Sequence, residues 1–201
     1  MYVICSDLEG VFIPEIWINV AKATGIEDLK LTTRDIPDYD KLMRYRIDIM
    51  AKHNLKLSDI QKVIGTMDLL PGADDMLSWL TALPQPFLIL SDTFVEFAQP
   101  FLPKLHYASV LCNSLVIDNK GAIVDYTLRQ PDGKRKVVDA LHSINYKVIA
   151  FGDSYNDLAM IQTADHGFLF RAPAKIKADY PHIPLTDEYA DLKNLIATVL
   201  G

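Results

Sequence analysis

Cysteine is scarce in this chain of 201 residues, and it has no long apolar run. The two cysteines, Cys5 and Cys112, each lie in an apolar, strand-like run. This predicts two reduced thiols in a hydrophobic core rather than a disulfide framework. No apolar run approaches the ~18 residues of a membrane-spanning helix, and no basic segment leads into an apolar stretch at the N-terminus. We therefore expect no membrane span, no signal peptide and a cytoplasmic protein.

Positive charge is also in short supply. The chain has 20 basic and 26 acidic residues, a formal net charge of −6, and no basic cluster longer than residues 134–136. Nucleic-acid binding requires a basic patch or stripe, so we expect no nucleic-acid partner. Because 50% of the residues are hydrophobic, the chain should fold as one domain, or as one domain with an inserted subdomain.

Two acidic segments each follow a short apolar run. The segment DLEG at 7–10 follows the run 2–5, and GDSYND at 152–157 follows the run 148–151. Both runs have the length and composition of buried parallel strands. Because open α/β sheets bind ligands at the carboxyl ends of their strands, the carboxylates should converge there. They would repel one another without a cation, and Mg²⁺ suits carboxylate and phosphate oxygens, so the pattern predicts a phosphoryl-transfer site.

The segment between the first strand and residue 70 has only helical patterns. Apolar spacing predicts helices over 15–24, 39–54 and 58–67, with a loop rich in charge and proline over 32–38. We therefore predict a helical cap subdomain over residues 13–70. The core domain would then comprise residues 1–12 and 71–201.

From residue 71 onward, helix and strand patterns alternate. We predict strands over 87–90, 110–112, 148–151 and 166–170, and helices over 73–83, 93–105, 134–144 and 189–200. Thr93 and Glu96 match a capping box that would begin the helix 93–105, and the turn around residues 119–121 predicts a β-hairpin. The expected fold is α/β, a doubly wound parallel sheet with a small helical cap.

These segments together resemble the haloacid-dehalogenase superfamily, in its phosphoserine phosphatase branch, where a helical cap follows the first strand. The chain is most similar to the group described as phosphoserine phosphatase/homoserine phosphotransferase. The resemblance extends over essentially the whole chain, with four motifs in the expected order. It implies Mg²⁺ as the cofactor and an aspartyl-phosphate intermediate. It also implies L-phosphoserine as the donor and water or homoserine as the acceptor.

The resemblance assigns catalytic roles to three residues. Asp7 matches the nucleophile, and Lys134 matches the lysine that pairs with the phosphate and the nucleophile. Arg135 and Lys136 are the alternatives in a shifted alignment. Glu9 stands where the family usually has an aspartate that acts as general acid and base. The extra methylene of Glu9 moves its carboxyl outward, so the standard geometry of the family is not assumed.

The metal ligands implied by the resemblance are Asp7, Asp153 and the backbone carbonyl of Glu9. Asn156 and Asp157 match the polar groups that orient the lysine and the metal shell. In the cap, Glu15 and Arg46 match the residues that hold the ammonium and carboxylate of phosphoserine.

A further candidate substrate-binding segment is Ser91, Asp92 and Thr93, after the strand 87–90. Ser91 would precede a helix N-terminus, where its hydroxyl and the neighbouring amides could bind phosphate. Asp92 departs from the glycine common at this position in phosphoserine phosphatases. Its charge would oppose phosphate binding unless it points away or meets the substrate's ammonium. With Lys134 and Asn156, this segment completes the expected substrate-binding residues of the core.

Three other functions stay open at this point. The same chemistry could act on another small phosphomonoester, the acidic cluster could belong to a receiver-like phosphorylation switch, or the protein could bind without catalysis. The cap and Glu9 count against the switch, which needs neither a lid nor an acid for a leaving alcohol. The expected partner is a small phosphorylated amino acid, and a homodimer stays an open alternative. Trp17 and Trp79 fall on apolar helix faces, and we interpret both as core residues.

Overall fold

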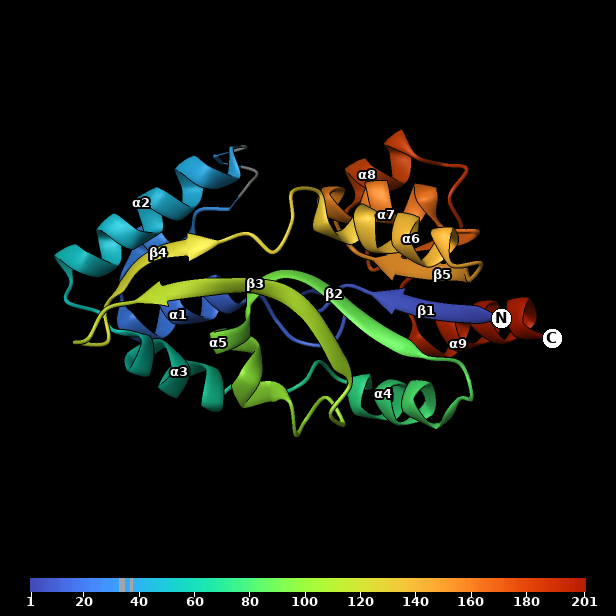
Figure 1. Cartoon of the computed structure of the whole chain (residues 1–201), viewed down its shortest axis with the longest axis horizontal. Helices are drawn as coiled ribbons and strands as arrows, with labels where there is room; N and C mark the ends of the chain where they lie inside the picture. Colours follow the sequence, from blue (N-terminus) through green and yellow to red (C-terminus); the bar gives the residue numbers. More distant parts are fainter. Residues whose placement is uncertain (33–34, 37) are drawn as a thin grey trace.

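A seven-stranded sheet in the order β4-β3-β2-β1-β5-β6-β7 runs through the molecule (Figure 1). The computed structural model describes residues 1–32, 35–36 and 38–201, so parts of the predicted loop 32–38 lie outside the described residues. The strands are β1 (Tyr2–Ser6), β2 (Phe87–Phe94), β3 (Ser109–Ile117), β4 (Ile123–Thr127), β5 (Lys147–Gly152), β6 (His166–Phe170) and β7 (Leu185–Thr186). β3 and β4 form the predicted antiparallel hairpin, and the other neighbouring strands pair in parallel.

Helices cover both faces of this sheet. They are α1 (Ile16–Thr24), α2 (Tyr39–Lys52), α3 (Leu57–Gly65), α4 (Ala73–Ala82), α5 (Val95–Ala98), α6 (Gly133–Ser143), α7 (Leu158–Thr163), α8 (Ala174–Asp179) and α9 (Tyr189–Leu200). In Figure 1, α6, α7 and α8 lie on one face of the parallel strands, and α4 and α9 lie on the other. The predicted doubly wound α/β fold is therefore confirmed.

Alternating side chains of the central strands explain why both faces are covered. Val3 and Cys5 of β1 belong to the apolar cluster that includes residues of α6, α7 and α8, whereas Ile4 belongs to the cluster with α4 and α9. A strand that is apolar on both faces must be buried on both, as in parallel α/β sheets. Cys5 and Cys112 are both free and buried, as predicted. Within the described part of the chain, no helix is long and apolar enough to cross a membrane.

The helical insert packs against the β3–β4 hairpin, which lies beside α2 in Figure 1. Arg44 Nη1 of α2 lies 2.6 Å from Asp125 Oδ1 of β4, and Tyr126 Oη donates a 2.6 Å hydrogen bond to Asp40 Oδ1. At the hairpin turn, the Gly121 carbonyl accepts a hydrogen bond from the backbone N–H at the start of α3. The hairpin is thus attached to the insert by contacts from two helices.

The segment after residue 90 differs from its prediction. β2 continues to Phe94, and its register with β3 shifts between Leu90 and Phe94, so residues 91–93 form an irregular stretch inside the strand. The predicted helix 93–105 is wrong, because α5 spans only Val95–Ala98 and a 3₁₀ turn follows over Gln99–Phe101. Pro100 has no N–H for a continuing α-helix. The Thr93–Glu96 capping box is also wrong, since Glu96 Oε2 accepts a hydrogen bond from the Leu115 N–H instead.

Candidate active site

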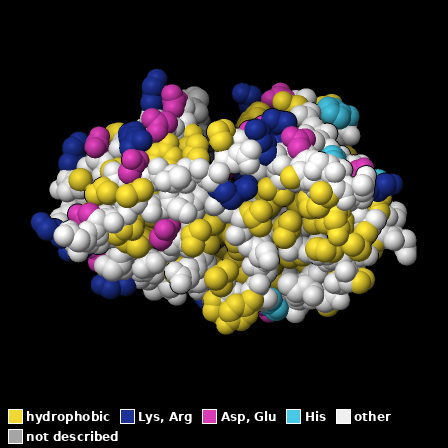
Figure 2. Space-filling model, viewed as in Figure 1, with side chains coloured by type: hydrophobic (Ala, Val, Ile, Leu, Met, Phe, Trp, Pro, Cys, Tyr) yellow, Lys and Arg dark blue, Asp and Glu magenta, His cyan; other side chains and the backbone are white. Residues whose placement is uncertain are grey.

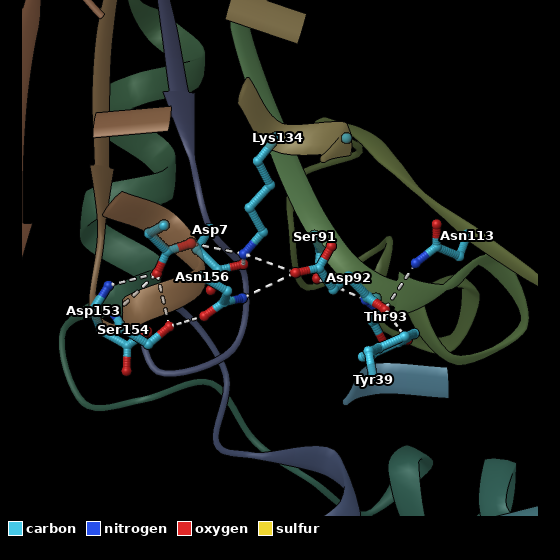
Figure 3. A network of polar contacts seen from close by, with 12 residues as sticks. Asp7, Tyr39, Ser91, Asp92, Thr93, Asn113, Lys134, Asp153, Ser154 and Asn156 are labelled. Atoms are coloured by element: carbon cyan, nitrogen blue, oxygen red, sulfur yellow. Dashed lines mark hydrogen bonds and ion pairs between the residues drawn. The ribbon is translucent and has the colours of Figure 1, made fainter. Parts of the chain in front are cut away.

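The polar residues predicted at the strand ends meet at the carboxyl edge of the sheet. Asp7 follows β1, and Asp153 follows the neighbouring β5. The Asp7 N–H donates a hydrogen bond to the carbonyl of Phe151 in β5. On the other side of β1, the irregular stretch of β2 contributes Asp92 (Figure 3). The chain runs from β1 to β2 on one side and to β5 on the other, so this edge is the switch point where α/β sheets bind ligands.

Lys134 lies at the centre of this edge, on the first turn of α6. Its Nζ is 2.8 Å from Asp7 Oδ1 and 2.7 Å from Asp157 Oδ1, and all three side chains are at most 7% exposed. Burial disfavours the charged amine, but Asp157 and Asp7 outweigh it and raise the pKa of Lys134 well above its usual value. Lys134 is therefore a fixed positive charge beside Asp7. Arg135 instead forms ion pairs with Asp139 of the same helix and with Asp132, which directly precedes the helix.

Asp157 holds the turn that carries Asp153. Its Oδ2 accepts hydrogen bonds of 3.0 Å from the backbone N–H groups of Asp153 and Ser154 and from Ser154 Oγ, while its Oδ1 meets Lys134. Both oxygens of this fully buried carboxylate thus have partners. A side chain at Gly152 would overlap the Asp157 carboxylate, which explains the glycine there. Asp157 therefore orients Lys134 and Asp153.

Three carboxylates here offer oxygens within 4.8 Å of one another, namely those of Asp7, Asp153 and Asp157. Burial, with the charge of Asp157 added, raises the pKa of Asp153 to about 7 and that of Asp7 well above its usual range. Burial is the largest cause of both shifts, so the ionised form of each carboxylate is disfavoured here unless a cation compensates it. Since Asp157 is fully engaged, Asp7 and Asp153 are the carboxylates that suit a hard divalent cation such as Mg²⁺.

Glu9 lies on the side of the site that faces the insert. Its Oε2 accepts a 2.8 Å hydrogen bond from the N–H of Ile16, the first residue of α1. Burial and the nearby charge of Glu15 raise the pKa of Glu9 to about 7, although the hydrogen bond from Ile16 and the charges of Arg46 and Lys134 act in the opposite direction. A carboxyl with this pKa can both give and take a proton near neutral pH.

Arg46 is buried on α2, with 6% of its surface exposed. Its guanidinium carbon lies 4.6 Å from the centre of the Trp17 ring, and its Nη2 donates a 2.8 Å hydrogen bond to the Leu31 carbonyl. Its Nε has no hydrogen-bond partner among the described residues. Burial lowers the pKa of Arg46 to about 10, which still leaves it charged at neutral pH. A buried cation with a free N–H is suited to bind an anionic group of a ligand.

Trp17 is a core residue, as predicted, but it also supports Arg46. It is 8% exposed and packs edge-on against Phe97, with the ring centres 5.4 Å apart. Helical periodicity identified its buried face but carried no information about the guanidinium stacked on its ring. Glu15, by contrast, is exposed, and its charge raises the pKa of both Glu9 and Asp153.

Asp92 points into the site. Asn156 Nδ2 donates a 3.0 Å hydrogen bond to Asp92 Oδ2, and Lys134 Nζ lies 3.8 Å from the same oxygen. The carboxylate therefore points toward the expected phosphoryl-transfer residues, and it contacts Lys134 and Asn156, two of the expected substrate-binding residues. Figure 3 shows the Asp92 carboxylate on the side of Lys134 and Asn156, with Tyr39 and Asn113 on the other side.

Ser91 and Thr93 are both buried, and the Thr93 N–H donates a 3.2 Å hydrogen bond to Ser91 Oγ. The helix N-terminus expected directly after Ser91 is wrong, because the strand continues and α5 begins only at Val95. The local geometry at Ser91 thus comes from an irregular strand rather than from a strand–helix turn.

Sequence reasoning missed three residues of this network. Tyr39 Oη and Asn113 Nδ2 each donate a 3.0 Å hydrogen bond to the Asp92 carbonyl, and nothing in their local sequence indicated this. Ser154 was detectable, because a serine three residues before Asp157 matches the capping box that the structure shows.

Comparison with known proteins agrees with this geometry. A family model described as haloacid dehalogenase-like hydrolase matches residues 6–165. "Phosphoserine phosphatase ThrH" of Pseudomonas aeruginosa is 50% identical over 193 residues, which cover 96% of this chain and 94% of that protein. "Phosphoserine phosphatase" of Pseudomonas syringae pv. tomato is 49% identical over 189 residues, which cover 94% of this chain and 79% of that protein.

Solved structures show the same fold. A substrate-bound phosphoserine phosphatase complex matches with a TM-score of 0.76 and 17% identity, covering 98% of this chain and 97% of that chain. A phosphoserine phosphatase in apo form matches with a TM-score of 0.74 and 18% identity, with the same coverage of both chains. The family model and the relatives at about 50% identity confirm the resemblance seen in the motifs. The chain belongs to the haloacid dehalogenase-like hydrolases.

Proposed function

We propose that this protein is a Mg²⁺-dependent phosphoserine phosphatase that works through an aspartyl phosphate at Asp7. The observation that carries the proposal is the buried Asp7 carboxylate, held by Lys134 at 2.8 Å beside the carboxylate of Asp153. The names of the two relatives at about 50% identity support phosphoserine as the substrate.

Two displacements at phosphorus would make up the reaction. In the first, an Asp7 carboxylate oxygen bonds to phosphorus, the bond to the serine oxygen breaks, and Glu9 gives its proton to the leaving alkoxide. In the second, Glu9 takes a proton from water as that water attacks phosphorus, which frees Asp7 and releases phosphate. A Glu9 pKa of about 7 suits both transfers. Lys134 holds Asp7 in place and meets the negative phosphoryl oxygens.

The metal would be held by Asp7 and Asp153, with the Glu9 backbone carbonyl as the third protein ligand. Bound Mg²⁺ supplies charge neutralisation for the phosphoryl oxygens. The feature of this chain that fits a divalent cation is the set of three carboxylates with oxygens within 4.8 Å of one another. Burial, with the charge of Asp157 added, raises the pKa of Asp7 and of Asp153 there. Asp157 and Asn156 would position the groups around it.

The insert over residues 13–70 would act as a cap that selects the substrate. Arg46 would bind the substrate carboxylate through its free N–H, and Glu15 would bind the ammonium. A cap of this size suits a small metabolite, because closing it excludes water from the phosphoryl group. On the face shown in Figure 2, basic side chains are interspersed with acidic ones over α2, which agrees with a small-molecule partner rather than a nucleic acid. We also expect the protein to act in the cytoplasm.

The first test is a screen of small phosphomonoesters with Mg²⁺. Phosphoserine should be hydrolysed fastest, EDTA should abolish the release of phosphate, and added Mg²⁺ should restore it. Asp153→Asn should need a higher Mg²⁺ concentration for half-maximal rate. Faster turnover of another ester would favour the alternative substrate, and a phosphorylated form that survives for minutes without turnover would favour the receiver-like switch. Full activity in EDTA would contradict the metal site.

Homoserine is a second proposed acceptor. The Glu9 carboxyl lies at the N-terminus of α1, on the cap side of the site, where an acceptor hydroxyl would also enter. Adding labelled homoserine to the phosphoserine reaction should give labelled phosphohomoserine together with free phosphate. Release of free phosphate alone at saturating homoserine would show that water is the acceptor.

Arg46→Ala tests the specificity assigned to the cap. Loss of a buried cation that binds a charged group costs about 2 kcal/mol or more, so kcat/KM for phosphoserine should fall by roughly 30-fold or more. p-Nitrophenyl phosphate has no α-carboxylate, so its turnover should change much less. Arg44→Ala is the matched control, because Arg44 lies on the same helix but is half-exposed and pairs with Asp125. Equal losses on both substrates would show that Arg46 is structural.

A further inference from the structure

The Asp92 carboxylate forms a hydrogen bond with Asn156 and an ion pair with Lys134, two side chains that a bound phosphate would also use. Its Oδ2 accepts the 3.0 Å bond from Asn156 Nδ2 and lies 3.8 Å from Lys134 Nζ. Lys134 is thus surrounded by three carboxylates, those of Asp7, Asp157 and Asp92. The first two are buried and fixed, whereas the Asp92 side chain is 45% exposed. Of these three carboxylates, Asp92 is therefore the one that can move aside while the buried ion pairs of Lys134 with Asp7 and Asp157 stay intact.

Backbone contacts fix the position of Asp92 at the edge of the site. Residues 91–93 lie in the irregular stretch of β2, which turns Asp92 out of the regular strand pattern. The Asp92 carbonyl is held by Tyr39 Oη from the insert and by Asn113 Nδ2 from β3, each at 3.0 Å. The main chain is thus fixed on two sides while the carboxylate end stays half-exposed.

We propose that Asp92 is an internal anion that competes with phosphate for Lys134 and Asn156 and so promotes the release of product phosphate. This inference rests on the proposed function, since it concerns the same site. An incoming phosphate must replace Asp92 as the acceptor of the Asn156 N–H and as an ion-pair partner of the Lys134 amine. It must also sit beside a like charge, which opposes binding. When phosphate leaves, Asp92 regains its hydrogen bond from Asn156 and its ion pair with Lys134.

The experiment is a calorimetric titration of the Mg²⁺-loaded protein with inorganic phosphate, compared with phosphate inhibition of turnover. Asp92→Asn keeps the shape of the side chain and an oxygen that accepts from Asn156, but it removes the charge. We expect phosphate to bind this variant about tenfold more tightly than the wild type, with an equal fall in the inhibition constant. Asp92→Ala should shift both constants in the same direction, which covers the case in which Asp92→Asn does not fold.

The matched control is Asp139→Asn. Asp139 has the same exposed fraction of 45%, and its partner is Arg135 at 2.8 Å, so the variant makes the same change in net charge. Its phosphate affinity should equal that of the wild type. Unchanged or weaker phosphate binding in both Asp92 variants, or no binding by any of these proteins, would overturn the proposal.

These readouts separate the inference from the substrate assignment. If the Asp92 variants bind phosphate more tightly but phosphoserine is not hydrolysed, the internal anion stands and the substrate proposal fails. If phosphoserine is hydrolysed but phosphate affinity does not rise in the variants, the proposed function stands and the role of Asp92 is wrong.

Discussion

Asp7→Asn should leave no measurable turnover and no covalent phosphoenzyme, whereas Glu9→Gln should slow the reaction only by roughly 10²–10⁴-fold. An amide cannot take the place of the carboxylate that attacks phosphorus, but Glu9 contributes only proton transfer. With p-nitrophenyl phosphate, whose leaving group needs little protonation, Glu9→Gln should still form the phosphoenzyme. Mass measurement of acid-quenched protein distinguishes the two variants.

The control for this comparison is thermal unfolding of both variants. Asp7 is one of two buried carboxylates within 2.8 Å of the Lys134 amine, so Asp7→Asn should alter stability while leaving the protein folded. If Asp7→Asn retains more activity than Glu9→Gln, the two roles have been assigned incorrectly.

Gly10→Ala should reduce kcat/KM by about 10²-fold or more, since a displacement of about 1 Å in a catalytic group can have an effect of this size. Gly10 has a φ of +76°, and a Cβ at this position would overlap the Asp153 carboxylate. The alanine would therefore displace the Asp153 carboxylate from its present position. A Mg²⁺ titration of the rate should show a raised requirement for the metal.

Gly25→Ala is the matched control. Gly25 ends α1 with a φ of +72°, and a Cβ there would meet no atom within 4 Å. Both variants carry the same left-handed strain, roughly 1–2 kcal/mol. Gly10→Ala adds the overlap with Asp153, so it should lose at least as much stability in thermal unfolding as Gly25→Ala. Only Gly10→Ala should lose activity. Equal activity of the two variants would mean that Asp153 need not hold its position.

Local patterns in the sequence were sufficient for the parts of the site that lie next to regular strands. The apolar runs before Asp7 and Asp153 predicted β1 and β5, and the rule for parallel sheets then brought the two carboxylates to one edge. The helix that begins beside Lys134 was also visible from its spacing. Each of these predictions needed only a few neighbouring residues.

The surroundings of Asp92 could not be predicted in the same way. The residues that hold its carbonyl, Asn113 and Tyr39, lie 21 and 53 positions away in the chain, and the direction of its side chain depends on a register shift between two strands. Such features result from long-range packing, which overrides local preference. The stacking of Arg46 on Trp17 belongs to the same class, because periodicity identifies a buried face but not the side chain that covers it.

The attachment of the β3–β4 hairpin to the insert determines what could be exchanged between related enzymes. A graft of residues 13–70 alone would lose the ion pair of Arg44 with Asp125 and the hydrogen bond from Tyr126 to Asp40, and the hairpin would face a foreign helix. We therefore expect the exchangeable unit to be discontinuous and to comprise residues 13–70, residues 114–117 of β3, and β4. A chimaera with a new specificity should carry both pieces from one parent.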